Sequence, residues 1–92
     1  MMIKKLTAMP YAQAHIEIDN NGNKTLFSYV TRVAELTNDG WLTIYGLHSM
    51  TTRKHISAFM REYTNLDYYT AKAAYEGNYR INVNTGEVEE LA

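Results

Sequence analysis

The sequence predicts a single α+β domain over residues 1–92, in which an antiparallel sheet of three or four strands carries two helices on one face. Three observations predict this fold. Residues 14–19 alternate apolar and polar side chains, as a strand with one buried face does. Asn and Gly provide turn signals at residues 20–23 and 37–40. Residues 56–63 repeat apolar side chains at helical spacing.

The first part of the chain contains an arm and a strand. Residues 1–12 show no clear period, and Pro10 limits any helix there, so we expect an irregular or extended arm. The strand at residues 14–19 directs alternate side chains into the core. These inward side chains are Ala14, Ile16 and Ile18.

The middle of the chain is typical of strands. Residues 24–36 are rich in β-branched and aromatic side chains. Their alternation breaks near Tyr29 and Val30, so we expect a bulge there or two short strands. Residues 41–45 follow the next turn and complete a three-stranded meander.

Two helices and a C-terminal strand are expected next. Ser49, Thr51 or Thr52 can cap the first helix. Its core stripe consists of Ile56, Phe59, Met60 and Tyr63. A variant capping box at residues 64–67 should start the second helix, which Gly77 ends. The second stripe consists of Leu66, Tyr68, Ala71 and Tyr75. Residues 79–83 form a strand, and residues 87–91 are the candidate for a short edge strand.

Charge, cysteine content and apolar stretches exclude several classes of function. The formal net charge is −1, so no global field attracts nucleic acid or an anionic membrane. The chain contains no cysteine, which excludes disulfides, thiolate zinc sites and cysteine nucleophiles. No stretch approaches the ~20 apolar residues of a membrane helix, and the first ten residues do not form a signal peptide. We therefore expect a cytoplasmic protein.

The aromatic face of the third strand is the leading candidate site. Trp41, Thr43 and Tyr45 share one face, and Phe27 or Tyr29 is expected beside them. If the helices cover the Leu42 side of this strand, the aromatic side chains form an exposed protein-binding surface or a homodimer contact. The alternative is that the aromatic side is the core. Both interpretations remain open from the sequence.

The first helix offers a second candidate site. Arg53, Lys54, Ser57 and Arg61 form a small basic face, which predicts a nucleic-acid-binding surface as the alternative function. A solvated helix face explains the same pattern. Three charges also release few counterions compared with a dedicated DNA-binding protein.

Histidine patterns do not predict a metal site or an enzyme. His15, His48 and His55 lack the spacing of zinc ligands, and neither HxxxH nor HExxH occurs. Serine and threonine residues near His48 and His55 occupy positions that suit helix caps. We therefore expect no cofactor, no metal and no enzymatic activity.

The stretch from residue 26 to 63 resembles small uncharacterised proteins that phages and prophages of Gram-positive bacteria encode. The resemblance rests on the pairs Ser28-Tyr29, Val33-Ala34, Tyr45-Gly46, Thr51-Thr52 and His55-Ile56, with Ser49 and Phe59. It implies a host cytoplasm and an accessory factor that binds host machinery, including anti-defence proteins such as anti-CRISPRs. The prediction is a binding protein whose partner is a host protein or a second copy of itself. A homodimeric structural domain is a further alternative.

Overall fold

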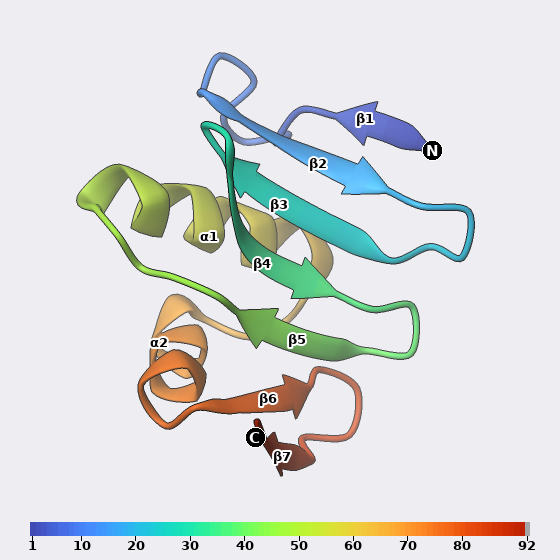
Figure 1. Cartoon of the computed structure of the whole chain (residues 1–92), viewed down its shortest axis with the longest axis vertical. Coiled ribbons are helices and arrows are strands. Elements are labelled where there is room, and N and C mark those ends of the chain that lie inside the picture. Colours follow the sequence, from blue (N-terminus) through green and yellow to red (C-terminus); the bar gives the residue numbers. More distant parts are fainter. Residues whose placement is uncertain (92) are drawn as a thin grey trace.

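The computed structural model describes residues 1–91, which form one seven-stranded sheet and two helices. The strands lie in sequence order across the sheet, and every neighbouring pair is antiparallel (Figure 1). The strands are β1 (Met2–Lys4), β2 (Ala14–Ile18), β3 (Lys24–Ser28), β4 (Thr31–Leu36), β5 (Trp41–Ile44), β6 (Tyr79–Asn82) and β7 (Val88–Glu90). The helices α1 (Met50–Tyr63) and α2 (Tyr68–Glu76) connect β5 to β6.

The α+β class is confirmed, but the sheet is larger than the predicted three or four strands. The arm expected at residues 1–12 supplies β1, which pairs Met2 with Ile18 and Lys4 with Ile16. The rest of this arm contains Leu6, which is fully buried in the core. Strands of three residues are too short to produce a recognisable period, so the sequence pattern did not reveal β1.

The break predicted near Tyr29 and Val30 separates β3 from β4. Tyr29 has a φ of 57°, a left-handed conformation that suits a tight turn. The pairing register also shifts between Leu26 and Phe27, which leaves Val33 as an extra, fully buried residue in β4. The predicted alternative of two short strands is therefore confirmed, whereas the bulge lies at Val33 and not at the predicted position near Tyr29 and Val30.

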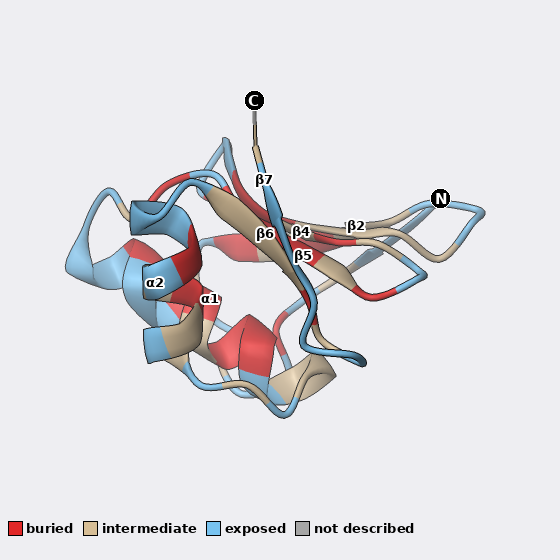
Figure 2. Cartoon of the chain, turned by 90° about the horizontal axis from the view of Figure 1, so that it is seen from below, coloured by how far each residue is buried: buried red, intermediate tan, exposed pale blue. Residues whose placement is uncertain are grey.

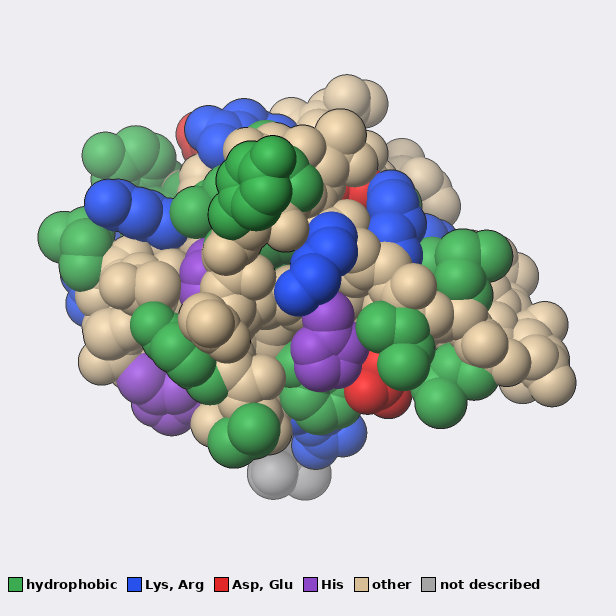
Figure 3. Space-filling model, turned by 90° about the horizontal axis from the view of Figure 1, so that it is seen from above, with side chains coloured by type: hydrophobic (Ala, Val, Ile, Leu, Met, Phe, Trp, Pro, Cys, Tyr) green, Lys and Arg blue, Asp and Glu red, His purple; other side chains and the backbone are tan. Residues whose placement is uncertain are grey.

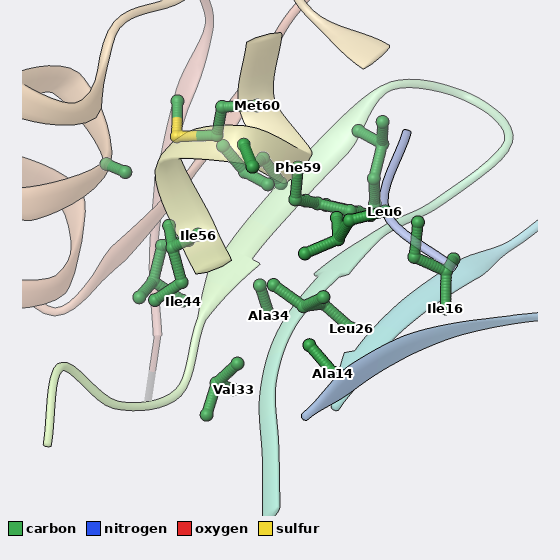
Figure 4. Close-up of a cluster of buried hydrophobic side chains, with 14 residues drawn as sticks. Leu6, Ala14, Ile16, Leu26, Val33, Ala34, Ile44, Ile56, Phe59 and Met60 are labelled. Carbon is green, nitrogen blue, oxygen red and sulfur yellow. The ribbon is translucent and has the colours of Figure 1, made fainter. Parts of the chain in front are cut away.

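Both helices cover the same side of the sheet (Figure 2). Leu26, Ala34 and Ile44 lie opposite one another on adjacent strands, and all are buried. Ile56 and Phe59 of α1 pack onto them (Figure 4). The core therefore lies on the aliphatic side of β5, which confirms the predicted stripe of α1 and settles which face of the sheet the helices cover.

The start of α2 differs from the sequence prediction. Asp67, not Thr64, is the N-cap, and its carboxylate accepts the N–H of Thr70 at 3.0 Å. Thr64 instead ends α1, because its N–H donates to the carbonyl of Met60 at 2.8 Å. The predicted burial of Tyr75 is also wrong, since this side chain is exposed. Ala71 and Ala74 form the buried face of α2. Neither helix in residues 1–91 is long and apolar enough to cross a bilayer.

Candidate functional site

The sheet face opposite the helices is uncovered by any other element of residues 1–91 (Figure 2). Side chains alternate along β5, so Trp41, Thr43 and Tyr45 point away from the helices, while Leu42 and Ile44 point toward them. We call this surface the open face. Its members are His15, Phe27, Arg32, Trp41, Thr43, Tyr45 and Arg80, together with Glu17, Glu35 and Glu89.

Arginine side chains lie over the two largest rings of the open face. The guanidinium carbon of Arg32 is 4.2 Å from the ring centre of Tyr45, and that of Arg80 is 4.3 Å from the ring centre of Trp41. Each cation–π contact contributes about 0.5–1 kcal/mol at an exposed site. Arg80 also pairs with Glu89 at 2.9 Å. The rings are therefore held in place, yet Tyr45 stays 37% exposed.

The open face carries polar contacts beside its rings. The Tyr45 hydroxyl donates to a Glu35 carboxylate oxygen at 3.2 Å, and burial together with the Glu35 charge raises the pKa of Tyr45. The His15 ring stacks on Phe27 with centroids 4.9 Å apart, and its Nε2 lies 3.0 Å from a Glu17 oxygen. Side chains of both charge signs therefore surround the aromatic rings.

Tyr29 is separated from the other predicted binding residues. It lies at the β3–β4 turn, and its ring centre is 6.2 Å from that of His55 in α1. The ring is 54% exposed at the end of the sheet. Its expected place beside Trp41 is wrong, because the turn after Ser28 takes the chain out of the open face. Phe27, the other residue expected there, does lie on the open face.

Beneath Tyr29, the polar side chains of Ser28, Thr52 and His55 form a small buried network. Ser28 Oγ lies 2.8 Å from His55 Nδ1 and 3.3 Å from Thr52 Oγ1. Ser49, the N-cap of α1, accepts the N–H of Thr52 at 3.1 Å. Burial lowers the pKa of His55. The network connects the first turns of α1 to β3.

A serine next to a histidine is also the arrangement of a nucleophile and its base. Ser28 and His55 are 2% and 1% exposed, so a substrate carbonyl has no path to the hydroxyl. No acidic side chain of residues 1–91 hydrogen-bonds His55 to orient it. The pair therefore has the features of a structural contact.

The described residues also hold no group of three or more His, Asp or Glu side chains in metal-binding geometry. His15 lies on the open face, His55 is buried under Tyr29, and His48 is exposed before α1. The structure thus keeps the three candidate ligands apart. The absence of a metal or cofactor stays a prediction.

The predicted basic face of α1 divides into two places. Arg53, Lys54 and Ser57 line a groove of about 430 Å³ between α1 and α2. Arg61 instead borders a smaller depression beside Thr7. We call the first feature the interhelical groove; its lining is completed by Met50 of α1 and by Tyr68, Tyr69 and Lys72 of α2.

The contribution of α2 to this groove could not be predicted from the sequence. Tyr69 and Lys72 lie on the side of α2 that is away from the sheet, and only the packing of α2 beside the first half of α1 brings them to Arg53. On the β1 side of the molecule the basic groups are dispersed, and Lys and Arg side chains are separated there by hydrophobic and neutral ones (Figure 3).

Comparison with known proteins gives a family and no activity. A model described as a family of unknown function (DUF8033) matches residues 1–77. Neither the curated proteins nor the solved structures gave a match. The matched range contains β1 to β5, both helices and the whole interhelical groove, and it ends before β6 and β7.

Proposed function

The chain belongs to the DUF8033 family, and we propose that it is a non-enzymatic protein-binding module that acts through the open face. One observation carries the proposal. Trp41 and Tyr45 lie on an uncovered sheet face, each beneath an arginine side chain. Trp, Tyr and Arg are the residue types most enriched among the hot spots of protein interfaces.

The open face is large enough for a stable interface. The molecule measures 33 × 30 × 24 Å along its principal axes, and the sheet lies across the two longer ones (Figure 1). A standard interface buries about 800 Å² on each partner, which requires nearly the whole of a face about 30 Å across. The size of the face therefore supports a folded partner that contacts several strands at once.

The charges on the open face favour a second copy of this chain as the partner. Arg32 and Arg80 stand among Glu17, Glu35 and Glu89. In a two-fold interface each patch meets itself, so a surface with both charge signs can place cations against carboxylates. The same carboxylates would repel a phosphate backbone, which argues against nucleic acid at this face.

Another occupant is a host protein, as the resemblance to small phage-encoded proteins predicts. The anti-defence role belongs to this version of the proposal. It requires the same rings and arginines of the open face, so the variants that test self-association also test it.

The experiment measures self-association by sedimentation equilibrium over a range of protein concentrations. Arg32→Glu reverses the exposed charge over Tyr45. Arg61→Glu makes the same charge change on the helix side and serves as the matched control. We expect a wild-type dimer whose dissociation constant rises at least about tenfold, or 1.4 kcal/mol, in Arg32→Glu and stays unchanged in Arg61→Glu.

A wild-type protein that stays monomeric would exclude the second copy. Capture of host proteins by the wild type and the same two variants then tests whether the open face binds a host protein instead. Capture that Arg32→Glu abolishes and Arg61→Glu preserves supports a host partner at the open face. If both variants capture the same proteins as the wild type, the open face is not the binding surface.

A further inference from the structure

The interhelical groove combines positive charge with exposed aromatic surface. Arg53 and Lys54 project from α1, and Lys72 projects from α2. No acidic side chain of the described chain lines the groove. The nearest acidic partner is Glu76, whose carboxylate lies 4.0 Å from Lys72 in an exposed pair of little strength. The groove is thus a local positive site on a chain of net charge −1.

Aromatic and apolar groups form the other walls. The Tyr69 ring is 76% exposed and lies 6.0 Å from the Tyr68 ring, in an edge-on arrangement. Met50 adds exposed apolar surface at the start of α1. The Tyr68 hydroxyl is buried without a hydrogen-bond partner among residues 1–91. An exposed ring beside three cations can stack on a planar group while the cations neutralise an anion.

We propose that the interhelical groove binds a nucleoside phosphate. Arg53, Lys54 and Lys72 hold the phosphate, and the base stacks on Tyr69. Guanidinium and ammonium groups make strong charge-assisted hydrogen bonds to phosphate oxygens. The volume of about 430 Å³ lies within the range of small-ligand sites and suits one nucleotide, not a duplex.

This assignment is independent of the protein-binding role of the open face. It also differs from the predicted basic face, because Arg61 is outside the groove and Tyr69 and Lys72 are within it. A base with its phosphate is presented both by a free nucleotide and by one nucleotide of a single strand, so the test includes both ligands.

The test titrates ¹⁵N-labelled protein with adenosine monophosphate, adenosine, inorganic phosphate and a short single-stranded oligoadenylate. The amide signals of α1 and α2 report binding at the groove. Arg53→Ala and Lys72→Ala should each weaken binding of adenosine monophosphate by about tenfold. Arg61→Ala removes the same charge from the same helix outside the groove and should leave binding unchanged.

The stacking role of Tyr69 is tested separately. Tyr69→Ala should weaken the binding of adenosine monophosphate by about tenfold and the binding of inorganic phosphate very little. Tyr69→Phe keeps the ring and should bind both ligands like the wild type. The ring is largely exposed, so these variants should keep the wild-type stability.

The possible outcomes distinguish a free nucleotide from a single strand, and nucleotide binding from unspecific phosphate binding. Adenosine monophosphate should bind more tightly than either inorganic phosphate or adenosine, and this result supports the site. If oligoadenylate binds more tightly still, and this extra affinity is lost at high salt, the natural ligand is a nucleotide within a single strand. Equal affinity for adenosine monophosphate and inorganic phosphate, with no effect of Tyr69→Ala, overturns the assignment. Absence of binding in low salt, or equal losses in Arg53→Ala and Arg61→Ala, overturns it as well.

Discussion

Replacing Ser28 by alanine should destabilise the protein by about 1–3 kcal/mol, because a buried polar atom loses its closest partner. Ser28 Oγ lies 2.8 Å from His55 Nδ1, and both residues are almost completely buried. Water cannot replace the hydroxyl without opening the contact between α1 and β3. For a domain of this size, 1 kcal/mol corresponds to about 5 °C, so the melting temperature should fall by about 5–15 °C.

A double-mutant cycle separates this pair from a general packing defect. His55→Leu removes the imidazole and keeps a similar apolar volume. In the variant with both changes, neither partner is left unsatisfied, so its loss should be smaller than the sum of the single losses by about 1 kcal/mol or more. Urea denaturation followed by Trp41 fluorescence measures each free energy of unfolding. Strictly additive losses would show that Ser28 and His55 do not interact.

The same pair predicts a pH dependence. Burial lowers the pKa of His55 in the folded protein, so the unfolded chain binds a proton more readily. The free energy of unfolding should therefore be highest above the unfolded pKa of about 6.5 and should decrease as the pH falls through the folded pKa. His55→Leu should remove this decrease, while a change at the exposed His48 should not. A decrease that persists in His55→Leu would assign it to other groups.

Two further predictions concern the N-terminal strand and a turn. The Lys4 ammonium donates a hydrogen bond to the Glu62 carboxylate. Burial alone would raise the pKa of Glu62, but the hydrogen bonds that the carboxylate accepts have the larger effect, so its pKa in the folded protein lies below the usual value. Glu62→Gln should therefore cost about 1 kcal/mol near pH 7 and progressively less as the pH falls through that pKa, as urea titrations at several pH values would show. Gly40 has a φ of 98° and a Cβ there would lie 2.6 Å from Asn84 Nδ2, so Gly40→Ala should lower stability by about 1–3 kcal/mol. Gly86→Ala, with a similar φ and no atom within 4 Å, should cost less; equal losses would exclude the steric contribution.

The sequence identified the elements with a strong period. The alternation of residues 41–45 placed Trp41 and Tyr45 opposite Leu42, and the spacing of residues 56–60 placed the core stripe of α1. These patterns succeeded because each residue's face follows directly from strand or helix geometry. The choice between the two faces needed the structure, since both sides of β5 carry large apolar or aromatic groups.

Features that depend on tertiary packing were not predictable. The strand β1 has three residues and is defined only by its neighbour, whereas the short edge strand expected at residues 87–91 is present as β7. Thr64 and Asp67 both suit an N-cap, and the structure uses Thr64 to end one helix and Asp67 to begin the next. The arginine over Trp41 comes from β6, almost forty residues later in the chain, so no local pattern connects the two.

The two proposed surfaces lie on opposite sides of the sheet, and this arrangement makes each experiment a control for the other. Arg32 belongs to the open face, and Arg53 belongs to the interhelical groove. Both side chains are exposed, so neither substitution removes core contacts. If each variant loses only its own ligand, the two surfaces act independently. If either variant loses both ligands while its stability is unchanged, the surfaces are coupled through the sheet and α1, and the buried contact between Ser28 and His55 is the first connection to test.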